Sequence, residues 1–187
     1  SLLYTLEIKE YAESKGILLI PGIEKIIEGK EFLLYNFTEE ELSKINKIDD
    51  LRQIKNEHNL IIAPHPYYKG KTCLGNMLES LKDVVDGLEF CYFHTKFLNM
   101  NKKAEEYCKK YNKTLIASSD SHRLDRFNDN YSQVNADKEI NSVIKSIKEG
   151  NVLIKTKPLS VLDVIKELFH FKKSYIKRGI NNVRTRN

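Results

Sequence analysis

Short apolar runs alternate along the chain with stretches of helical periodicity, a pattern typical of an α/β fold. We expect strands at residues 17–20, 31–37, 60–63, 84–92, 114–117, 131–134 and 152–156. We expect helices at residues 3–15, 38–57 with a break near Asp49, 74–82, 101–111, 137–149 and from 160 onward. Thr38 with Glu41, and Ser160 with Asp163, have the spacing of capping boxes, which predicts where two of these helices begin.

The chain has 187 residues, of which 41% are hydrophobic and 30% are charged, a composition typical of an ordinary folded domain. No apolar run has the length of a membrane span, and Cys73, Cys91 and Cys108 lack metal-type spacing, so we expect reduced thiols in a cytoplasmic protein. The net charge of +5 comes from the tail, because residues 171–187 carry six basic residues and no acid. We expect a solvated tail, with nucleic acid or an acidic membrane surface as the alternative partner.

Polar side chains that can bind a metal follow several of the apolar runs. Asp120 and His122 come directly after the run 114–117, and His65 stands between two prolines after the run 60–63. The prolines predict an extended backbone at His65. Glu24 follows the run 17–20 and a Pro-Gly turn. Because parallel strands end at the same edge of a sheet, we expect these four side chains to lie close together.

Such a set of imidazole and carboxylate donors suits Zn, Mn or Fe. The alternative for Asp120 and His122 is an Asx turn with a solvated histidine, and for Glu24 a solvated loop position. Glu89 lies within an apolar run, so it needs a partner, a metal or a role in orienting a ligand.

Three further features of the sequence have plain structural explanations. The segment 67–71, with Lys69 and Lys71, fits either an anion contact or an ordinary loop. We expect His58 to lie at a helix end and His94 to be structural or on the surface.

The four segments 20–24, 62–66, 86–89 and 119–123 resemble, in this order, the motifs of the PHP (polymerase and histidinol phosphatase) superfamily of metal-dependent phosphoesterases. Residues 99–104 and the segment after Arg123 are similar to the PHP-associated C-terminal region. The resemblance covers about residues 1–160. It implies a distorted (β/α)7 TIM-like barrel that holds two or three divalent ions, which would be Mn, Zn or Fe.

The resemblance also implies roles for individual residues. The implied metal ligands are Glu24, His65, Asp120, His122 and Glu31. Glu31 stands where the family often has a histidine, and its harder oxygen donor shifts the preference from Zn towards Mn or Fe. Glu89 would orient a ligand, and Arg123, Lys69 and Lys71 would face the phosphate of the substrate.

The family's opening His-x-His strand and the Asp and Asp-His that follow it are not in this sequence, in which no histidine precedes His58. We therefore expect a barrel that lacks its first strands over residues 1–157, then an amphipathic helix and basic tail over 158–187. The expected activity is hydrolysis of a phosphorylated small molecule, a nucleotide or an oligonucleotide end. The alternative is a non-catalytic module that binds a partner or nucleic acid through its basic tail.

Overall fold

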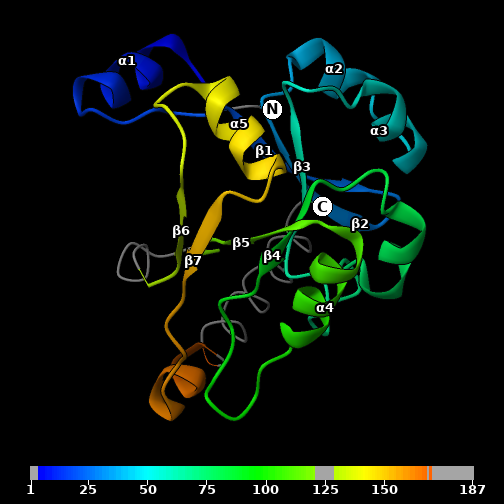
Figure 1. Ribbon diagram of the computed structural model, residues 1–187, viewed down its shortest axis with the longest axis vertical. Coiled ribbons are helices and arrows are strands. Elements are labelled where there is room, and N and C mark those ends of the chain that lie inside the picture. The colour runs from blue at the N-terminus through cyan, green and yellow to red at the C-terminus, as the bar shows by residue number, and fades with distance from the viewer. Residues whose placement is uncertain (1–3, 121–128, 168, 170–187) are drawn as a thin grey trace, which may run out of the picture.

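The computed structural model describes residues 4–120, 129–167 and 169 of the chain. Its centre is a five-stranded sheet of order β1-β2-β3-β4-β5 (Figure 1). The strands are β1 (Gly22–Ile27), β2 (Lys30–Tyr35), β3 (Leu60–Ala63), β4 (Gly87–Phe90) and β5 (Thr114–Ala117). A separate two-stranded antiparallel sheet pairs β6 (Tyr131–Val134) with β7 (Val152–Lys155) beside β5.

The five-stranded sheet is mixed, and this corrects the expectation of a TIM-like barrel. Strands β3, β4 and β5 are parallel, whereas β1 pairs antiparallel with β2, and β2 pairs antiparallel with β3. The two-residue turn at Glu28 and Gly29, with φ values of 49° and 76°, joins β1 to β2 as a hairpin. A barrel needs a helical crossover there instead. The described residues therefore form an open sheet and not a closed (β/α)7 barrel.

Helices cover both faces of the sheet (Figure 1). They are α1 (Leu6–Ser14), α2 (Glu39–Lys44), α3 (Ile48–Ile54), the 3-10 helix η1 (Gly75–Leu81), α4 (Lys102–Tyr111) and α5 (Ile140–Lys148). The predicted capping boxes are confirmed, because Thr38 and Glu41 bond reciprocally at the start of α2. Ser160 and Asp163 do the same before the helical residues 161–167. Among the residues that the structure describes, every helix is too short or too polar to cross a lipid bilayer.

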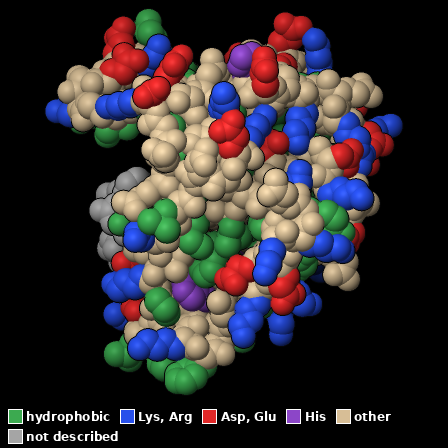
Figure 2. Space-filling model, in the orientation of Figure 1, with side chains coloured by type: hydrophobic (Ala, Val, Ile, Leu, Met, Phe, Trp, Pro, Cys, Tyr) green, Lys and Arg blue, Asp and Glu red, His purple; other side chains and the backbone are tan. Residues whose placement is uncertain are grey.

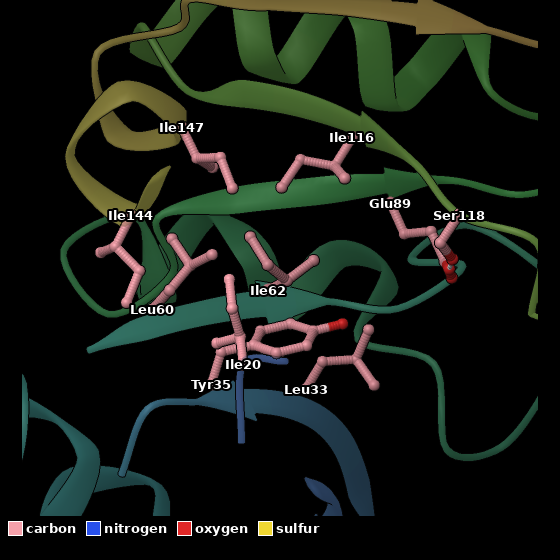
Figure 3. Close-up of a pocket in the computed structure, with 10 residues that line it drawn as sticks. All are labelled: Ile20, Leu33, Tyr35, Leu60, Ile62, Glu89, Ile116, Ser118, Ile144 and Ile147. Carbon is pink, nitrogen blue, oxygen red and sulfur yellow. Dashed lines mark hydrogen bonds between the residues drawn. The ribbon is translucent and has the colours of Figure 1, made fainter. Parts of the chain in front are cut away.

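The main hydrophobic core lies on the face of the sheet that α3, η1 and α4 cover. Phe32, Ile61 and Leu88 point into it from neighbouring strands, and each is almost completely buried. A smaller cluster lies on the opposite face, where Leu60 and Ile62 of β3 contact Ile144 of α5 (Figure 3). Successive residues of each strand therefore point alternately into the main core and towards the face that α5 covers.

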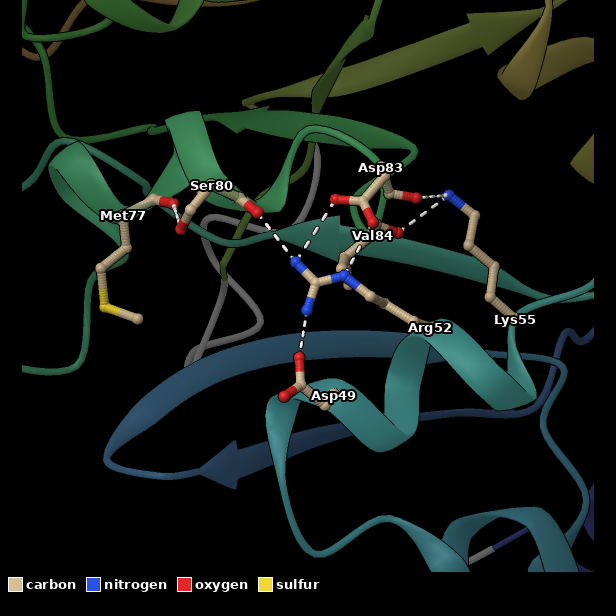
Figure 4. Close-up of polar contacts among 7 residues, drawn as sticks. All are labelled: Asp49, Arg52, Lys55, Met77, Ser80, Asp83 and Val84. Atoms are coloured by element: carbon tan, nitrogen blue, oxygen red, sulfur yellow. Dashed lines mark hydrogen bonds and ion pairs between the residues drawn. The ribbon is translucent and has the colours of Figure 1, made fainter.

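Arg52 of α3 ties the core helices to the loop before β4 (Figure 4). Its guanidinium donates to Asp83 at 2.7 Å, to the carbonyl of Ser80 at 2.8 Å, and to Asp49. One turn later, Lys55 pairs with the buried Asp86 at 2.7 Å, and Asp86 also accepts from the backbone N–H of Ile61 at 2.9 Å. These contacts fix the start of β4 beside β3, upstream of the strand ends.

The helix at residues 161–167 leaves apolar side chains in solvent at the lower end of the molecule (Figure 2). Val161, Leu162 and Phe169 are each about 70% exposed. They therefore do not belong to the core of the described chain. The basic tail at residues 170–187 lies outside the described residues, so the predicted boundary between a main domain and a C-terminal segment stays a prediction.

Candidate metal centre

Three parallel strands bring chemically active residues to one edge of the sheet. His65 follows β3, Glu89 lies within β4, and Asp120 follows β5. His65 and Asp120 have positive φ values, 27° and 40°. Such values are uncommon outside glycine and concentrate at functional sites, where they cost about 1–3 kcal/mol. This edge therefore holds two strained residues among the predicted site residues.

The backbone of His65 is not extended, so the prediction from its flanking prolines is wrong. Its N–H donates to Glu89 at 2.9 Å, and its carbonyl accepts from the N–H of Tyr68 at 3.0 Å. These two bonds close a turn directly at the end of β3. The tertiary contact with the buried Glu89 carboxylate therefore overrides the local preference for extended geometry.

Glu24, Glu31 and His65 bring their donor atoms within 4.8 Å of one another. The β1–β2 register explains how the two glutamates meet. Ile26 lies opposite Glu31, so Glu24, two residues before Ile26, is a diagonal neighbour of Glu31 on the same face. The Nε2 atom of His65 then lies 3.6 Å from an oxygen of Glu31. A hairpin and a strand end thus form the group together, rather than a row of parallel strand ends.

Residues around this group hold its donors in place. The hydroxyl of Thr72 donates to Glu31 at 2.8 Å, and the thiol of Cys73 lies 3.3 Å from Nδ1 of His65. Glu89 accepts from the hydroxyl of Ser118 as well as from the backbone of His65. Partners of this kind fix the orientation of a ligand and the tautomer of a histidine. The buried Glu89 carboxylate therefore has the partners that it needs, and its role in orienting a ligand stays a prediction.

The charges at this edge shift the pKa values of two groups. Burial lowers the pKa of His65, but the hydrogen bond with Cys73 and the negative charges of Glu89 and Asp120 outweigh it and raise the pKa to about 9. Burial raises the pKa of Glu89, and the Asp120 carboxylate adds to this effect. Asp120 therefore acts electrostatically on the site, although among the described residues it is not part of the group within 4.8 Å.

The other predicted site residues fall into two sets. Lys69 and Lys71 are exposed, and the backbone carbonyl of Lys71 accepts from Lys30 at 2.8 Å. Their contact with a phosphate stays a prediction. His122 and Arg123 lie outside the described residues. His94 is buried, with its ring against Phe90, as expected of a structural residue.

Four residues that contact or approach this site were not predicted from the sequence as site residues: Tyr35, Thr72, Cys73 and Ser118. Only Tyr35 could have been predicted from the sequence, because residues 31, 33 and 35 of a strand lie on the same face as one another. The contacts of Thr72 and Cys73 depend on the path of the loop 65–73, which no local pattern predicts.

The donor set of Glu24, Glu31 and His65 fits a divalent ion. Ligands at ~2.0–2.2 Å from one ion lie at most about 4.4 Å apart. The three donors are therefore close enough to reach one ion after small movements of their side chains. Two carboxylates with one imidazole suit Mn, Fe or Zn. Their role as ligands is a prediction that the arrangement makes chemically reasonable.

Replacing Cys73 with alanine is expected to lower the pKa of His65 from about 9 towards its ordinary value of 6.5. A metal binds the neutral imidazole, so protons compete with it below this pKa. The affinity of the unmodified protein for Mn²⁺ should therefore rise about tenfold per pH unit up to about pH 9, and that of Cys73→Ala should level off at a lower pH. NMR titration of the imidazole and calorimetry with Mn²⁺ measure both effects. Cys73→Ser, which keeps an acceptor, is the matched control, and identical profiles in all three proteins would contradict this account.

Comparison with known proteins adds a family context to this geometry. Residues 99–152 match a protein-family model described as PHP-associated, which confirms the predicted PHP-associated region. The match spans α4, β5, β6, α5 and the first residue of β7, and does not include Glu24, Glu31 or His65. A search of curated proteins finds no matching sequence.

A similar fold occurs in the crystal structure of PsfC from Pseudomonas syringae PB-5123. The two chains superpose with a TM-score of 0.57 at 14% sequence identity, over 85% of this chain and 68% of PsfC. At this identity the likeness concerns the fold alone.

Proposed function

We propose that this chain belongs to a divalent-metal-dependent phosphoester hydrolase whose metal is bound by Glu24, Glu31 and His65. The convergence of their donor atoms within 4.8 Å at the end of β3 carries the proposal. The PHP-associated region at residues 99–152 supports it, since the motifs elsewhere in the chain resemble those of the same superfamily. A bound divalent ion would supply an activated water and neutralise charge on phosphoryl oxygens.

The residues of the chain preorganise this group. His65 is held through its backbone by Glu89 and through its ring by Cys73, which leaves Nε2 directed towards Glu31. The Thr72 hydroxyl donates to the same carboxylate oxygen of Glu31 that His65 approaches. Donors fixed in this way bind an ion without a large loss of side-chain entropy. The substrate phosphate would lie at the exposed Glu24 side of the group, within the range of Asp120 and the loop 65–73.

The test is hydrolysis by the purified chain with Mn²⁺ of p-nitrophenyl phosphate, bis(p-nitrophenyl) phosphate and a short oligonucleotide. We expect turnover that EDTA abolishes and that Glu31→Gln reduces by at least ~100-fold. Glu39→Gln, an exposed glutamate at the start of α2, is the matched control and should retain activity.

The outcomes of this test separate the two functions that the sequence allows. Binding of Mn²⁺ without turnover of any substrate would favour a non-catalytic binding module. The absence of both Mn²⁺ binding and turnover would contradict the proposal altogether. Turnover that Glu31→Gln leaves unchanged would place the chemistry elsewhere in the protein.

A further inference from the structure

A pocket of about 190 Å³ opens on the face of the sheet that α5 covers. Its walls are apolar side chains of β2, β3, β5 and α5, among them Ile62, Ile116 and Ile147 (Figure 3). Glu89 and Ser118 lie together at one end, and the hydroxyl of Tyr35 points towards that end. The pocket therefore has one polar end and an apolar interior.

The pocket and the metal-binding group share a face of the sheet. Glu31, Leu33 and Tyr35 alternate on β2, so the strand that carries a predicted ligand also lines the pocket with its next two side chains on that face. On β3, Ile62 lines the pocket and His65 follows three residues later. The group and the pocket are therefore neighbours along β2 and β3 on this face of the sheet.

A hydrogen bond joins the polar end of the pocket to the group. Glu89 accepts from the backbone N–H of His65 at 2.9 Å. Burial, followed by the negative charges of Glu89 and Glu24, raises the pKa of Tyr35 to about 12. Tyr35 lines the pocket, and its hydroxyl stays protonated and available as a hydrogen-bond donor.

We propose that this pocket binds the apolar alcohol group of a phosphoester whose phosphate lies at Glu24, Glu31 and His65. This inference rests on the proposed function and names its substrate class: phosphoesters of small alkyl or aryl alcohols. The Tyr35 and Ser118 hydroxyls at the polar end face the junction between phosphate and alcohol, and the isoleucines receive the hydrocarbon.

The size of the pocket limits the alcohol. An apolar cavity of ~150 Å³ accommodates benzene, so the present pocket has room for a single ring or a chain of about six carbons. Each buried methylene contributes ~0.8 kcal/mol. If half of this is realised for the five additional methylenes of a hexyl group, hexyl phosphate gains about 30-fold over methyl phosphate.

The test compares kcat/KM for methyl, butyl and hexyl phosphate with Mn²⁺, and the affinity of the protein in the presence of Mn²⁺ for methyl and hexyl phosphonate by calorimetry. We expect both to increase with chain length. Ile147→Phe, which fills the pocket from α5, should remove most of the hexyl-to-methyl ratio. Ile116→Phe fills it from β5 and serves as a second variant if the first does not fold. Leu153→Phe, at an exposed position of β7 outside the pocket, should retain the ratio.

Each result points in one direction. Turnover that is independent of chain length overturns the pocket inference and leaves the proposed function intact. If there is no turnover, but the protein binds hexyl phosphonate more tightly than methyl phosphonate and Ile147→Phe removes this preference, the pocket inference is supported. The proposed hydrolytic function is then contradicted. Absence of any chain-length dependence in both measurements, or a preference that both filling variants retain, overturns the inference.

Discussion

Replacing His65 with alanine is expected to weaken the binding of Mn²⁺ by more than ~100-fold and to abolish metal-dependent hydrolysis. The imidazole is the only nitrogen donor in the group with Glu24 and Glu31, among the residues that the structure describes. The two glutamates that remain would face each other without the cationic or metal-bound partner that offsets their repulsion. Calorimetry and the EPR signal of free Mn²⁺ measure the loss of affinity.

His58→Ala is the matched control for this substitution. His58 is an exposed histidine whose ring lies near Asn141 and Glu57, away from the group. It should leave the affinity for Mn²⁺ unchanged, which separates a specific ligand from general metal binding by surface imidazoles. Equal affinities of the His65→Ala and unmodified proteins would show that the ion, if any, binds elsewhere.

The sequence predicts the parallel half of the fold well, because β3 is a fully apolar run of strand length, and β4 and β5 are mainly apolar with one polar residue each, Glu89 and Thr114. It also predicts which residues end these strands. His65 and Asp120 follow β3 and β5, and both prove to be strained positions at one edge. Buried parallel strands leave such a clear pattern because both of their faces must be apolar.

The antiparallel half was predicted less well. The apolar run 17–20 is not a strand, and β1 begins at Gly22, where a turn was expected. As an edge strand with exposed residues on one face, β1 carries Glu24 and Lys25 and has no continuous apolar run. The turn at Glu28 and Gly29 pairs two antiparallel strands, which excludes the barrel that the family resemblance implied.

The convergence of Glu24 with Glu31 depends on that same hairpin. The expectation placed Glu24 at the end of a parallel strand, whereas it lies inside β1 and meets Glu31 diagonally across the β1–β2 ladder. Glu24 and His65 therefore do lie close together, but for a partly different geometrical reason, and their role as metal ligands stays a prediction. Contacts that depend on tertiary structure, such as Cys73 with His65, have no counterpart in the local sequence.

Gly87→Ala is expected to destabilise the protein by about 3 kcal/mol, which for a chain of this size lowers Tm by about 6–12 °C. Gly87 lies in β4 between Ile62 of β3 and Thr114 of β5. A Cβ atom added there would lie 2.6 Å from the backbone carbonyl oxygen of Thr114 and 3.1 Å from Cδ1 of Ile62. A backbone atom in a paired strand cannot turn aside as a side chain can, so β4 and β5 would have to separate.

Gly29→Ala provides the control for this prediction. Gly29 has a φ of +76°, but an added Cβ would meet nothing within 4 Å, so alanine there costs only the strain of a left-handed backbone, about 1 kcal/mol. Urea denaturation measures the free energy of unfolding of both variants. A loss of stability in Gly87→Ala no larger than that in Gly29→Ala would contradict the steric account.

Because Glu89 follows Gly87 by two residues on the same face, separation of β4 from β5 should also disturb the Glu89 contacts to Ser118 and His65. Gly87→Ala should therefore weaken Mn²⁺ binding as well as stability, whereas Gly29→Ala should affect stability alone.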